Sequence, residues 1–596
     1  MLAHPYQGIF HDANLYTLQA LAHLHPDLAQ DVFLRFGSQD RFTVFSPIYA
    51  AMIRMLGPDH AAALLTLTSQ AALIAAGWYL ARTVFASRQA ALLGVAVLIV
   101  IPGNYGPDRI FACIEPFLTP RMGAEACTAA GIAAALSGRK LCSTALLIAG
   151  LALHPVMAAA GVVLLFMNYV ALPHPGIAAP VVKLGIIWLL VAAFALPAGE
   201  WGRLDPDWLG RVSERSPYLF LSHWTLDDWG RAAIVLTTLS VGSFSPESPA
   251  RRLCLPAALT MVAGIVLTGL GCDVLHLTLI TQMQPWRWEW LAALVAAVTL
   301  PFIAITQWQR GAPGRTTVLL LLAAWIFGVG TFALITCMTA LASSSFARLK
   351  PRELRLAFWG SCAVIGLALI WRIASNLEFT EMHDMDGSLP VWLRRAMSFA
   401  HDGFATALLI GVAAWILRRW RALGSWACSA LAIAAIAAMW HSTWQMWSRR
   451  DFPPEMSARF ATWRTLIAPG DEVFWGESPL STWVLLNRPS YISGLQTSGM
   501  IFSRESSLEL ARRALALEGV VGPATFLSWS GAGAHLSLSP EALEGLCRLG
   551  VFDYLVTGAD LGPQPVAVMD HLKLYACRPH APLPTEPQAR AAAAAT

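Results

Sequence analysis

Apolar residues in this 596-residue chain are gathered into long blocks separated by short polar connectors. Such blocks are what α-helices need in order to cross the roughly 30 Å hydrocarbon core of a bilayer. They run approximately from 60 to 81, 89 to 102, 122 to 137, 141 to 171, 182 to 198, 232 to 245, 253 to 271, 288 to 307, 316 to 342, 354 to 373, 403 to 417 and 424 to 443, with a shorter one from 44 to 57. Several fall below the roughly 20 residues of an upright span, so we expect a mainly α, polytopic membrane bundle of about ten to twelve helices.

The composition supports a membrane protein and excludes several other classes. Hydrophobic residues make up 56% of the chain and charged residues only 13%, against about 25% charged residues in soluble domains. The net charge of +4 is spread without a basic face, which argues against a nucleic-acid partner. The ten cysteines contain no CxxC pair, which excludes a zinc ribbon, although Cys547 and Cys577 could form a disulfide if the polar tail is exported.

The charges of the connectors predict which side of the membrane each one occupies. Short connectors rich in Lys and Arg remain in the cytoplasm. They include Arg82 with Arg88, Arg139 with Lys140, Arg251 with Arg252, Arg310 with Arg315, Arg348 to Arg355, and Arg418 with Arg419 and Arg421. The longer loops 1–43, 199–231 and 374–402 are more acidic, and we expect them outside. Residues 316–342 separate two basic connectors but are too short to cross twice at about 1.5 Å per residue, so one connector must break the rule.

The chain divides into four parts. Residues 1–43 are expected to form an outer loop with short helices, and 44–450 the transmembrane helical domain. Strand-like runs alternate with helix-like ones over 451–580, which predicts a small soluble α/β domain on the outer side. Residues 581–596, rich in Pro and then Ala, are typical of a disordered tail. Because Met1 opens directly into a polar, acidic stretch, we favour a further helix upstream over a short tail carried across by the helices that follow.

The outer N-terminal segment contains the first candidate site. Asp12 and Tyr16 lie in one polar stretch, and Asp40 and Arg41 in another. A carboxylate such as Asp12 or Asp40 can accept the proton of an incoming hydroxyl group, or bind a divalent cation with a neighbour. The alternative for Asp12 is that it caps a helix.

Two further candidates lie at proline-interrupted points of apolar blocks. Between Glu115 and Arg121, two prolines expose backbone groups beside an acid and a base. These two residues either pair with each other and do nothing more, or Glu115 binds a metal or an acceptor. His154, before Pro155, is either a ligand or catalytic group, or part of a kink in which its imidazole bonds a freed carbonyl.

The fourth candidate is the sequence Gln284-Pro285-Trp286-Arg287 before a long apolar block. Tryptophan beside such a block indicates a membrane interface. The planar guanidinium of Arg287 suits a phosphate group, because it forms paired charge-assisted hydrogen bonds. Anchoring to lipid headgroups is the alternative.

In the loop 199–231, Arg215 and its aromatic and acidic neighbours could face a sugar, although an interfacial helix is the favoured interpretation.

Together these features resemble the GT-C class of integral-membrane glycosyltransferases, which use polyprenyl-phosphate sugars. The stretches that carry the resemblance are Asp12 to Tyr16, Gly37 to Pro47, Glu115 to Arg121, His154-Pro155 and Gln284 to Arg287. The resemblance implies sugar transfer, with inversion, to an envelope acceptor at the outer face of a bacterial inner membrane. It assigns the role of base or metal ligand to Asp12, a second acid to Glu115, and the lipid phosphate to Arg287 with help from Arg121. The chain departs from the class in one respect: the helix that normally precedes the catalytic loop is absent from it.

Two other classes remain open. A transporter or flippase would also place Arg, Glu and His along a pathway, but more often shows two similar halves, and the sequence has no such repeat. A non-catalytic scaffold for envelope assembly is the third alternative. The glycosyltransferase interpretation requires that Asp12 and Arg287, far apart in the sequence, converge at one extracytoplasmic cavity. The one cofactor that these residues suggest is a divalent cation, bound by Asp12, Glu115 or His154.

Overall fold

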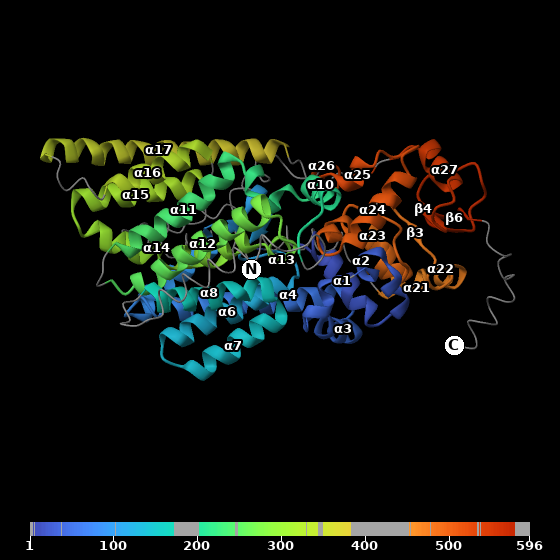
Figure 1. Ribbon diagram of the computed structural model, residues 1–596, viewed down its shortest axis with the longest axis horizontal. Helices are drawn as coiled ribbons and strands as arrows, with labels where there is room; N and C mark the ends of the chain where they lie inside the picture. The colour runs from blue at the N-terminus through green and yellow to red at the C-terminus, as the bar shows by residue number, and fades with distance from the viewer. Residues whose placement is uncertain are drawn as a thin grey trace, which may run out of the picture.

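The computed structural model describes residues 4–578, apart from 172–201, 245–247, 344–349, 383–451 and the positions 5, 37, 102, 329, 453, 477, 533–535 and 537. The expected spans at 182–198, 403–417 and 424–443, the basic connector at 418–421, most of the loop 374–402 and the tail at 581–596 lie outside the described residues, as does Gly37. The described chain forms a helical domain and, at one end of it, a C-terminal domain with a small sheet (Figure 1).

The helical domain follows the apolar blocks of the sequence. Its helices are α4 (Pro58–Ala81), α5 (Arg88–Val100), α6 (Pro120–Leu136), α7 (Lys140–Leu153), α8 (Pro155–Ala171), α11 (Leu226–Ser243), α12 (Arg251–Thr268), α14 (Glu289–Trp308), α15 (Ala312–Phe327), α16 (Gly330–Ser343) and α17 (Pro351–Met382). Within the described residues, four helical segments are long and apolar enough to cross a membrane: Pro58–Ala81, Arg251–Val274, Thr278–Trp308 and Pro351–Ala374.

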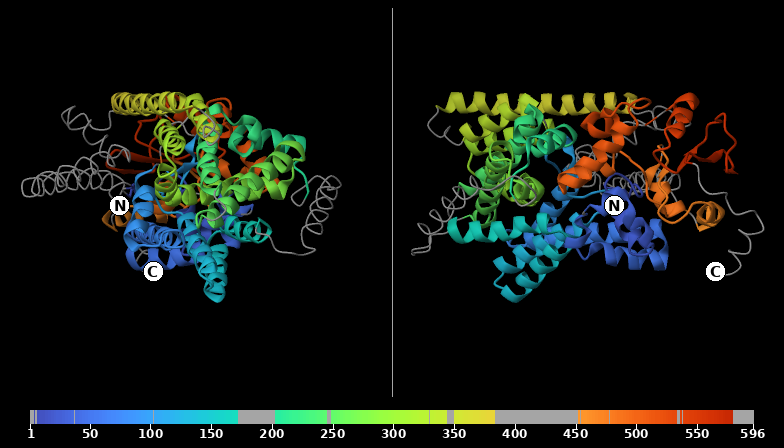
Figure 2. Two further views of the ribbon diagram at one scale, coloured as in Figure 1. Left: turned by 90° about the vertical axis from the view of Figure 1, so that its left-hand side faces the viewer. Right: turned by 45° about the vertical axis from the view of Figure 1, so that its right-hand side comes forward.

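Helix α14 is the central element of this domain. In the segment that contains it, 72% of the apolar window is buried, against 11% in α17, which lies along one edge (Figures 1 and 2). The small side chains of α14, mostly Ala and Val, let α5, α11 and α12 pack closely around it. The position of α14 matters for function because the residues directly before it belong to the candidate site.

Residues 316–342 form two helices rather than one span. Helices α15 and α16 meet at Gly328 and Gly330, which both have positive φ angles of 75° and 78°, and they pack against each other. The chain therefore turns back on itself within this block. Such a reversal would let both basic connectors lie on the same side of a membrane, which the charge rule favours; the side that each connector occupies stays a prediction.

The N-terminal segment forms short helices beside the C-terminal domain. These are α1 (Ala13–Ala22), η1 (Pro26–Gln30), α2 (Val32–Arg35), η2 (Gln39–Phe42) and α3 (Phe45–Leu56). The segment after residue 201 contributes α10 (Pro206–Arg215), η4 (Pro217–Leu219) and η5 (Leu221–His223) at the same end (Figure 1). Two of the three loops expected outside, 1–43 and 199–231, thus lie at one end of the molecule in their described parts.

The helical domain also contains several short elements. They are the hairpin of β1 (Asn104–Tyr105) and β2 (Phe111–Ala112) with η3 (Pro107–Arg109) in its turn, the π-helix η6 (Gly269–Val274), α13 (Thr278–Met283) and η7 (Pro285–Trp288). Helix α6 begins after Thr119, and α7 and α8 are separated at His154. The proline-interrupted points of the sequence are therefore breaks between helices, as expected.

The C-terminal domain contains a four-stranded sheet in the order β3-β4-β6-β5, formed by β3 (Val473–Phe474), β4 (Tyr554–Thr557), β5 (Ala567–Met569) and β6 (Leu572–Ala576). β3 and β4 are parallel and the other pairs antiparallel. Its helices are α21 (Pro454–Arg459), α22 (Ala461–Leu466), α23 (Pro479–Ser481), η9 (Thr482–Leu486), η10 (Gln496–Ile501), α24 (Arg504–Ala516), α25 (Ala524–Leu527), α26 (Trp529–Ala532) and α27 (Pro540–Arg548). A disulfide joins Cys547 to Cys577 and fastens α27 to the end of the sheet.

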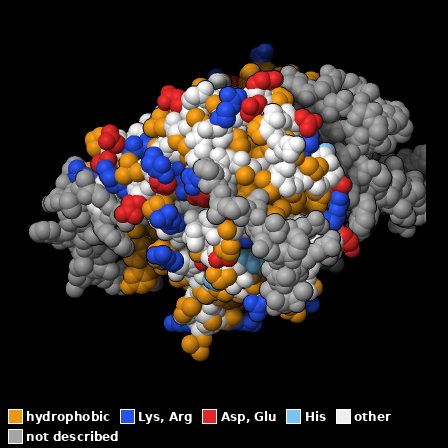
Figure 3. Space-filling view, turned by 90° about the vertical axis from the view of Figure 1, so that its right-hand side faces the viewer, with side chains coloured by type: hydrophobic (Ala, Val, Ile, Leu, Met, Phe, Trp, Pro, Cys, Tyr) orange, Lys and Arg blue, Asp and Glu red, His pale blue; other side chains and the backbone are white. Residues whose placement is uncertain are grey.

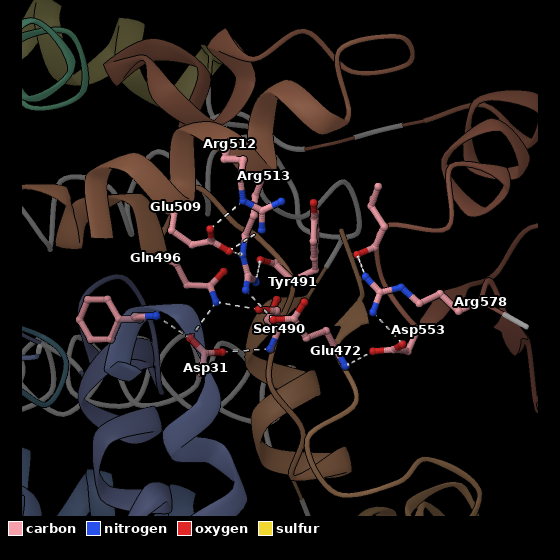
Figure 4. A network of polar contacts seen from close by, with 12 residues as sticks. Asp31, Glu472, Ser490, Tyr491, Gln496, Glu509, Arg512, Arg513, Asp553 and Arg578 are labelled. Carbon is pink, nitrogen blue, oxygen red and sulfur yellow. Dashed lines mark hydrogen bonds and ion pairs between the residues drawn. The ribbon is translucent and has the colours of Figure 1, made fainter. Parts of the chain in front are cut away.

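A buried carboxylate joins the N-terminal segment to the C-terminal domain. Asp31, with a relative exposure of 0%, accepts hydrogen bonds from the backbone N–H of Phe33 (3.0 Å) and Ser490 (2.9 Å). The side chains of Trp483 (2.9 Å) and Gln496 (2.8 Å) donate to the same carboxylate. Figure 4 shows Ser490 and Gln496 converging on Asp31. Burial raises the pKa of Asp31, while the four donors act in the opposite direction.

A second contact comes from the loop that was expected to form an interfacial helix. The Arg215 guanidinium of α10 donates to the Thr497 hydroxyl at 2.8 Å and to the Gly494 carbonyl at 2.7 Å. Arg215 therefore holds the C-terminal domain instead of facing a sugar. The far end of that domain carries Lys, Arg, Asp and Glu side chains interspersed with hydrophobic ones (Figure 3), as an exposed surface does.

Candidate functional site

Asp12 lies at the start of α1 but does not cap it. Its side chain makes no capping hydrogen bond, so the helix-capping alternative does not hold. Instead, the carboxylate Oδ2 lies 2.7 Å from Nη1 of Arg121, and Oδ1 lies 3.2 Å from Nδ1 of His11. Burial alone would raise the pKa of Asp12, but the charges of His11 and Arg121 outweigh it and hold this pKa well below its usual range. Asp12 is therefore ionised throughout the physiological pH range.

Arg121, in the first turn of α6, joins Asp12 to Glu115. Its Nε and Nη2 lie 2.9 and 2.7 Å from Oε1 of Glu115, and the other Glu115 oxygen accepts a hydrogen bond from Thr119. The Arg121 and Glu115 side chains are each 3% exposed, against 28% for Asp12. The pairing of Glu115 with Arg121 is thus present, and of the two acids only Asp12 is open to a substrate.

The ring of Phe111 brings Arg287 into the same cluster. The guanidinium carbon of Arg121 lies 4.6 Å from the ring centroid and that of Arg287 lies 4.3 Å from it. The two guanidinium carbons are therefore at most 9 Å apart, the sum of these distances. Cation–π contacts of this kind favour the charged form of each side chain. Asp12 and Arg287 thus belong to one cluster centred on Phe111.

Arg287 has no acidic partner among the residues that the structure describes. Its side chain belongs to a residue that is 8% exposed, and its Nε is buried without a hydrogen-bond partner. A buried guanidinium beside a second one, Arg121, is costly unless an anion joins it. This inward position does not fit the alternative that Arg287 anchors lipid headgroups at the surface.

The local fold around Gln284 explains how Arg287 is directed inward. Gln284 adopts a left-handed conformation with φ 48° and ends α13, and Pro285 then begins the 3-10 turn η7. The backbone N–H of Trp286 donates to the Thr268 hydroxyl of α12 at 2.9 Å. A Cβ on Gly106 would lie 2.2 Å from the Trp286 ring, so only glycine lets the β1–β2 turn approach this closely. Trp286 also stacks on Phe111.

Tyr16 and His154 line the same neighbourhood. Tyr16 lies one turn after Asp12 on α1, and burial raises its pKa to about 12, with Arg121 and Asp12 also within electrostatic range. His154 is buried, and its Nδ1 accepts a hydrogen bond from the Met157 N–H at 3.4 Å, so it bonds an amide and not the carbonyl expected for a kink. Arg287, Arg121 and Asp12 all lie within electrostatic range of His154.

Asp40 and Arg41 are not part of this cluster. Asp40 forms an ion pair with His23 at 3.0 Å on the surface. Arg41 is exposed and makes no ion pair within the described part of the chain. Their segment nevertheless passes close to the cluster, because Val44 donates to the carbonyl of Ala152 near the end of α7.

Three residues of the cluster were not found from the sequence. Phe111 and Tyr105 face it from the hairpin, and Glu125, 0% exposed, lies one helical turn after Arg121 on α6. Tyr105 donates to one Glu125 oxygen at 3.3 Å, whereas the other oxygen has no partner among the described residues. Glu125 carried a usable signal, because an acid within an apolar block is a candidate by default. The aromatic residues carried none.

The donor set does not fit a divalent cation. Within the ranges that the structure covers, no three His, Cys, Asp or Glu side chains are grouped as metal ligands are. Asp12 and Glu115 both face Arg121, and His154 points its Nδ1 at a backbone amide. A cation placed between the two acids would meet the Arg121 guanidinium, so we assign no step to a metal.

Comparison of the chain with protein-family models, with curated proteins and with solved structures finds no match.

Proposed function

We propose that this protein is a membrane glycosyltransferase that moves a sugar from a polyprenyl-phosphate donor to an envelope acceptor at the outer face of the inner membrane. The observation that carries the proposal is the meeting of Asp12 and Arg287 around Phe111. One is a partly exposed carboxylate and the other a buried cation without an acidic partner among the described residues. Sugar transfer from a lipid phosphate needs both groups at one place.

Asp12 takes the acceptor hydroxyl in this proposal. The hydroxyl oxygen bonds to the anomeric carbon of the sugar as the bond from that carbon to the phosphate oxygen breaks. The hydroxyl proton passes to Asp12, and the electron pair of the broken bond leaves with the lipid phosphate. Because its pKa is low, Asp12 is a weak base and accepts the proton late, once the forming bond has made the hydroxyl acidic. Attack from the face opposite the phosphate inverts the anomeric carbon.

Arg287 stabilises the departing phosphate. Negative charge grows on the phosphate oxygens as the glycosidic bond breaks, and a fixed guanidinium in a dry site interacts with it more strongly than water would. The absence of a carboxylate on Arg287, within the described residues, keeps its N–H groups available. Arg121, by contrast, already pairs with Asp12 and Glu115. It therefore contributes a second positive charge near the phosphate without binding the phosphate directly.

Glu115 is a positioning residue in this proposal. It is 2% exposed and binds Arg121 through Nε and Nη2, which leaves Nη1 for Asp12. Thr119 in turn donates to Glu115. The buried acid thus fixes the orientation of the arginine that holds the exposed one.

The test compares Asp12→Asn with Asp27→Asn in full-length protein reconstituted in lipid. Asp27 is a carboxylate of the same N-terminal segment, in η1, and serves as the matched control. A labelled polyprenyl-phosphate sugar is supplied, and release of the lipid phosphate is measured. We expect Asp12→Asn to lower the rate by about 100-fold or more and Asp27→Asn to leave it unchanged. Asp40→Asn tests whether the second predicted acid takes part.

Two outcomes would overturn the proposal. Wild-type rates with Asp12→Asn would remove the assigned base. Movement of the labelled lipid between leaflets without release of lipid phosphate would favour a flippase instead.

A further inference from the structure

A series of aromatic rings leads from the cluster around Phe111 to the C-terminal domain. Phe111 stacks on Trp286 with the ring centroids 5.8 Å apart. Trp286 meets the ring of Tyr218 at 6.3 Å, and Tyr218 meets the ring of Trp529 at 5.2 Å. Tyr218 belongs to η4, whereas Trp529 begins α26 of the C-terminal domain. The outer end of the series is therefore shared by two parts of the chain that are far apart in the sequence.

The two outer rings are accessible, unlike the inner ones. Trp286 is 1% exposed, whereas Tyr218 and Trp529 are half-buried. The Tyr218 hydroxyl and the Trp529 indole N–H are not buried, and neither forms a hydrogen bond with the described residues. Such rings suit a sugar, because the face of an aromatic ring attracts the weakly positive C–H groups on one side of a pyranose. The polar group at the edge of the ring can bond a sugar hydroxyl.

The outer rings lie close to both groups that carry the proposed reaction. Tyr218 is within electrostatic range of Arg287. Arg215 lies over the Trp529 ring, with its guanidinium carbon 5.9 Å from the ring centroid, and is within electrostatic range of Asp12. Helices α10 and α26 are in contact at the junction between the helical domain and the C-terminal domain (Figure 1). A ligand on these rings would therefore reach Asp12 from the C-terminal domain, whereas the lipid-linked donor would come from the membrane.

Other contacts hold this junction together. The Trp208 indole of α10 donates to the Met500 carbonyl at 2.8 Å. Arg504, at the start of α24, forms an ion pair of 2.6 Å with Asp205, directly before α10. The position of the two outer rings thus does not depend on the contact between them. A site that is already formed in this way binds a ligand without the cost of ordering its own side chains.

We propose that Tyr218 and Trp529 bind one pyranose ring of the acceptor, so that the acceptor is a glycan. The identity of this sugar as the acceptor rests on the proposed function, but its binding to the two rings does not require transfer. The bound sugar presents a hydroxyl group toward Asp12. Arg215 is a positioning residue, because it contacts Trp529 and holds α10 to the C-terminal domain.

The first experiment measures sugar binding to the full chain by saturation-transfer NMR, in a detergent without a sugar headgroup. The probes are the methyl pyranosides of glucose, galactose, mannose and N-acetylglucosamine. Sorbitol is the control ligand, because it has the hydroxyl groups of a sugar without the face of a ring. We expect at least one methyl pyranoside to bind, and sorbitol not to bind. Failure of all four pyranosides to bind would overturn the proposal.

Variants locate the binding. Trp529→Ala should weaken binding of the pyranoside by roughly tenfold, and Trp529→Phe by less, because phenylalanine keeps the ring face but not the indole N–H. Trp308→Ala is the matched control, because an arginine, Arg315, also lies over this ring at 5.5 Å, and Trp308 is at the opposite end of α14 from the site. Equal binding by wild type and Trp529→Ala would show that the sugar binds elsewhere and would overturn the proposal.

The second experiment separates this inference from the proposed function. Release of lipid phosphate is measured with the pyranoside that binds, or with a serine-containing tripeptide, as the acceptor. We expect Trp529→Ala to raise KM for the pyranoside by roughly tenfold and to change kcat by less than about twofold, whereas Asp12→Asn lowers kcat. Release with the peptide but not with the pyranoside would overturn the glycan acceptor and leave the proposed function in place. Binding at Trp529 without release from any acceptor would contradict the proposed function and support the sugar site.

Discussion

The carboxylate of Asp12 and the guanidinium of Arg121 meet at 2.7 Å although the two residues are 109 positions apart in the chain. The same guanidinium also binds Glu115. One arginine therefore serves a buried acid and a partly exposed one. Removing that arginine should lower stability, whereas removing Arg287, which has no acidic partner among the described residues, should not.

Arg287→Gln should abolish sugar transfer without lowering stability. Arg287 has no acidic partner in the described residues and lies within 9 Å of a second guanidinium carbon, so its removal relieves repulsion. Arg121→Gln should instead destabilise the protein by about 3–5 kcal/mol, because it leaves the Glu115 carboxylate buried and unpaired. Thermal unfolding in detergent, run in parallel with the transfer assay, measures both. Equal destabilisation by the two variants would contradict the assignment.

His11 should make stability depend on pH. The negative charge of Asp12 raises the pKa of His11, although burial opposes it. A raised pKa in the folded state gives a contribution that is complete below the unfolded value of about 6.5 and is lost as the pH rises through the folded value. The His11 side chain is 42% exposed, so we expect less than about 1 kcal/mol. Denaturation from pH 6 to pH 9 should therefore show a steeper loss for wild type than for His11→Asn, whereas His223→Asn, an exposed histidine, should follow wild type.

Asp31→Asn should release the C-terminal domain from the N-terminal segment. Four donors converge on the two carboxylate oxygens, and an amide would turn an NH₂ group toward two of them. Each buried donor left without an acceptor costs about 1–3 kcal/mol. Hydrogen exchange should become faster in η10 and at Ser490, and Asp27→Asn is the control. Unchanged protection of both segments would show that Asp31 does not hold the two parts together.

Gly106→Ala should disturb the site through Trp286. The added Cβ would lie 2.2 Å from the ring, so Trp286 must move, and Arg287 follows it in the chain. Gly138→Ala is a matched control, because its φ of +76° is close to the +74° of Gly106 but no atom lies within 4 Å of the new Cβ. We therefore expect loss of transfer only for Gly106→Ala. If both variants lose activity equally, backbone strain and not the contact with Trp286 is responsible.

The sequence was informative wherever a pattern has a direct physical cause. Apolar blocks mark the helices, and the two proline-interrupted points mark breaks between them. Asp12, Glu115, Arg121, His154 and Arg287 were all identified because a charged or titratable group beside an apolar block is costly and so needs a reason. Their convergence, however, depends on Phe111, an aromatic residue among 26 phenylalanines that no local pattern distinguishes.

Other features depend on tertiary contacts that sequence distance conceals. Asp40 resembled Asp12 in the sequence, but its partner is His23 on the surface. The reversal between α15 and α16 follows from Gly328 and Gly330, where positive φ angles end one helix and begin the next.

The buried carboxylate of Asp31 also has a consequence for biogenesis. Its three distant donors, Trp483, Ser490 and Gln496, are synthesised more than 450 residues after it. The segment that contains Asp12 leaves the ribosome long before these donors do, so its anchoring waits until the C-terminal domain has been synthesised and has folded. A chain that stalls during translation would hold its candidate catalytic acid on an unanchored segment, so under the proposed function the order of synthesis would keep incomplete molecules from transferring sugar.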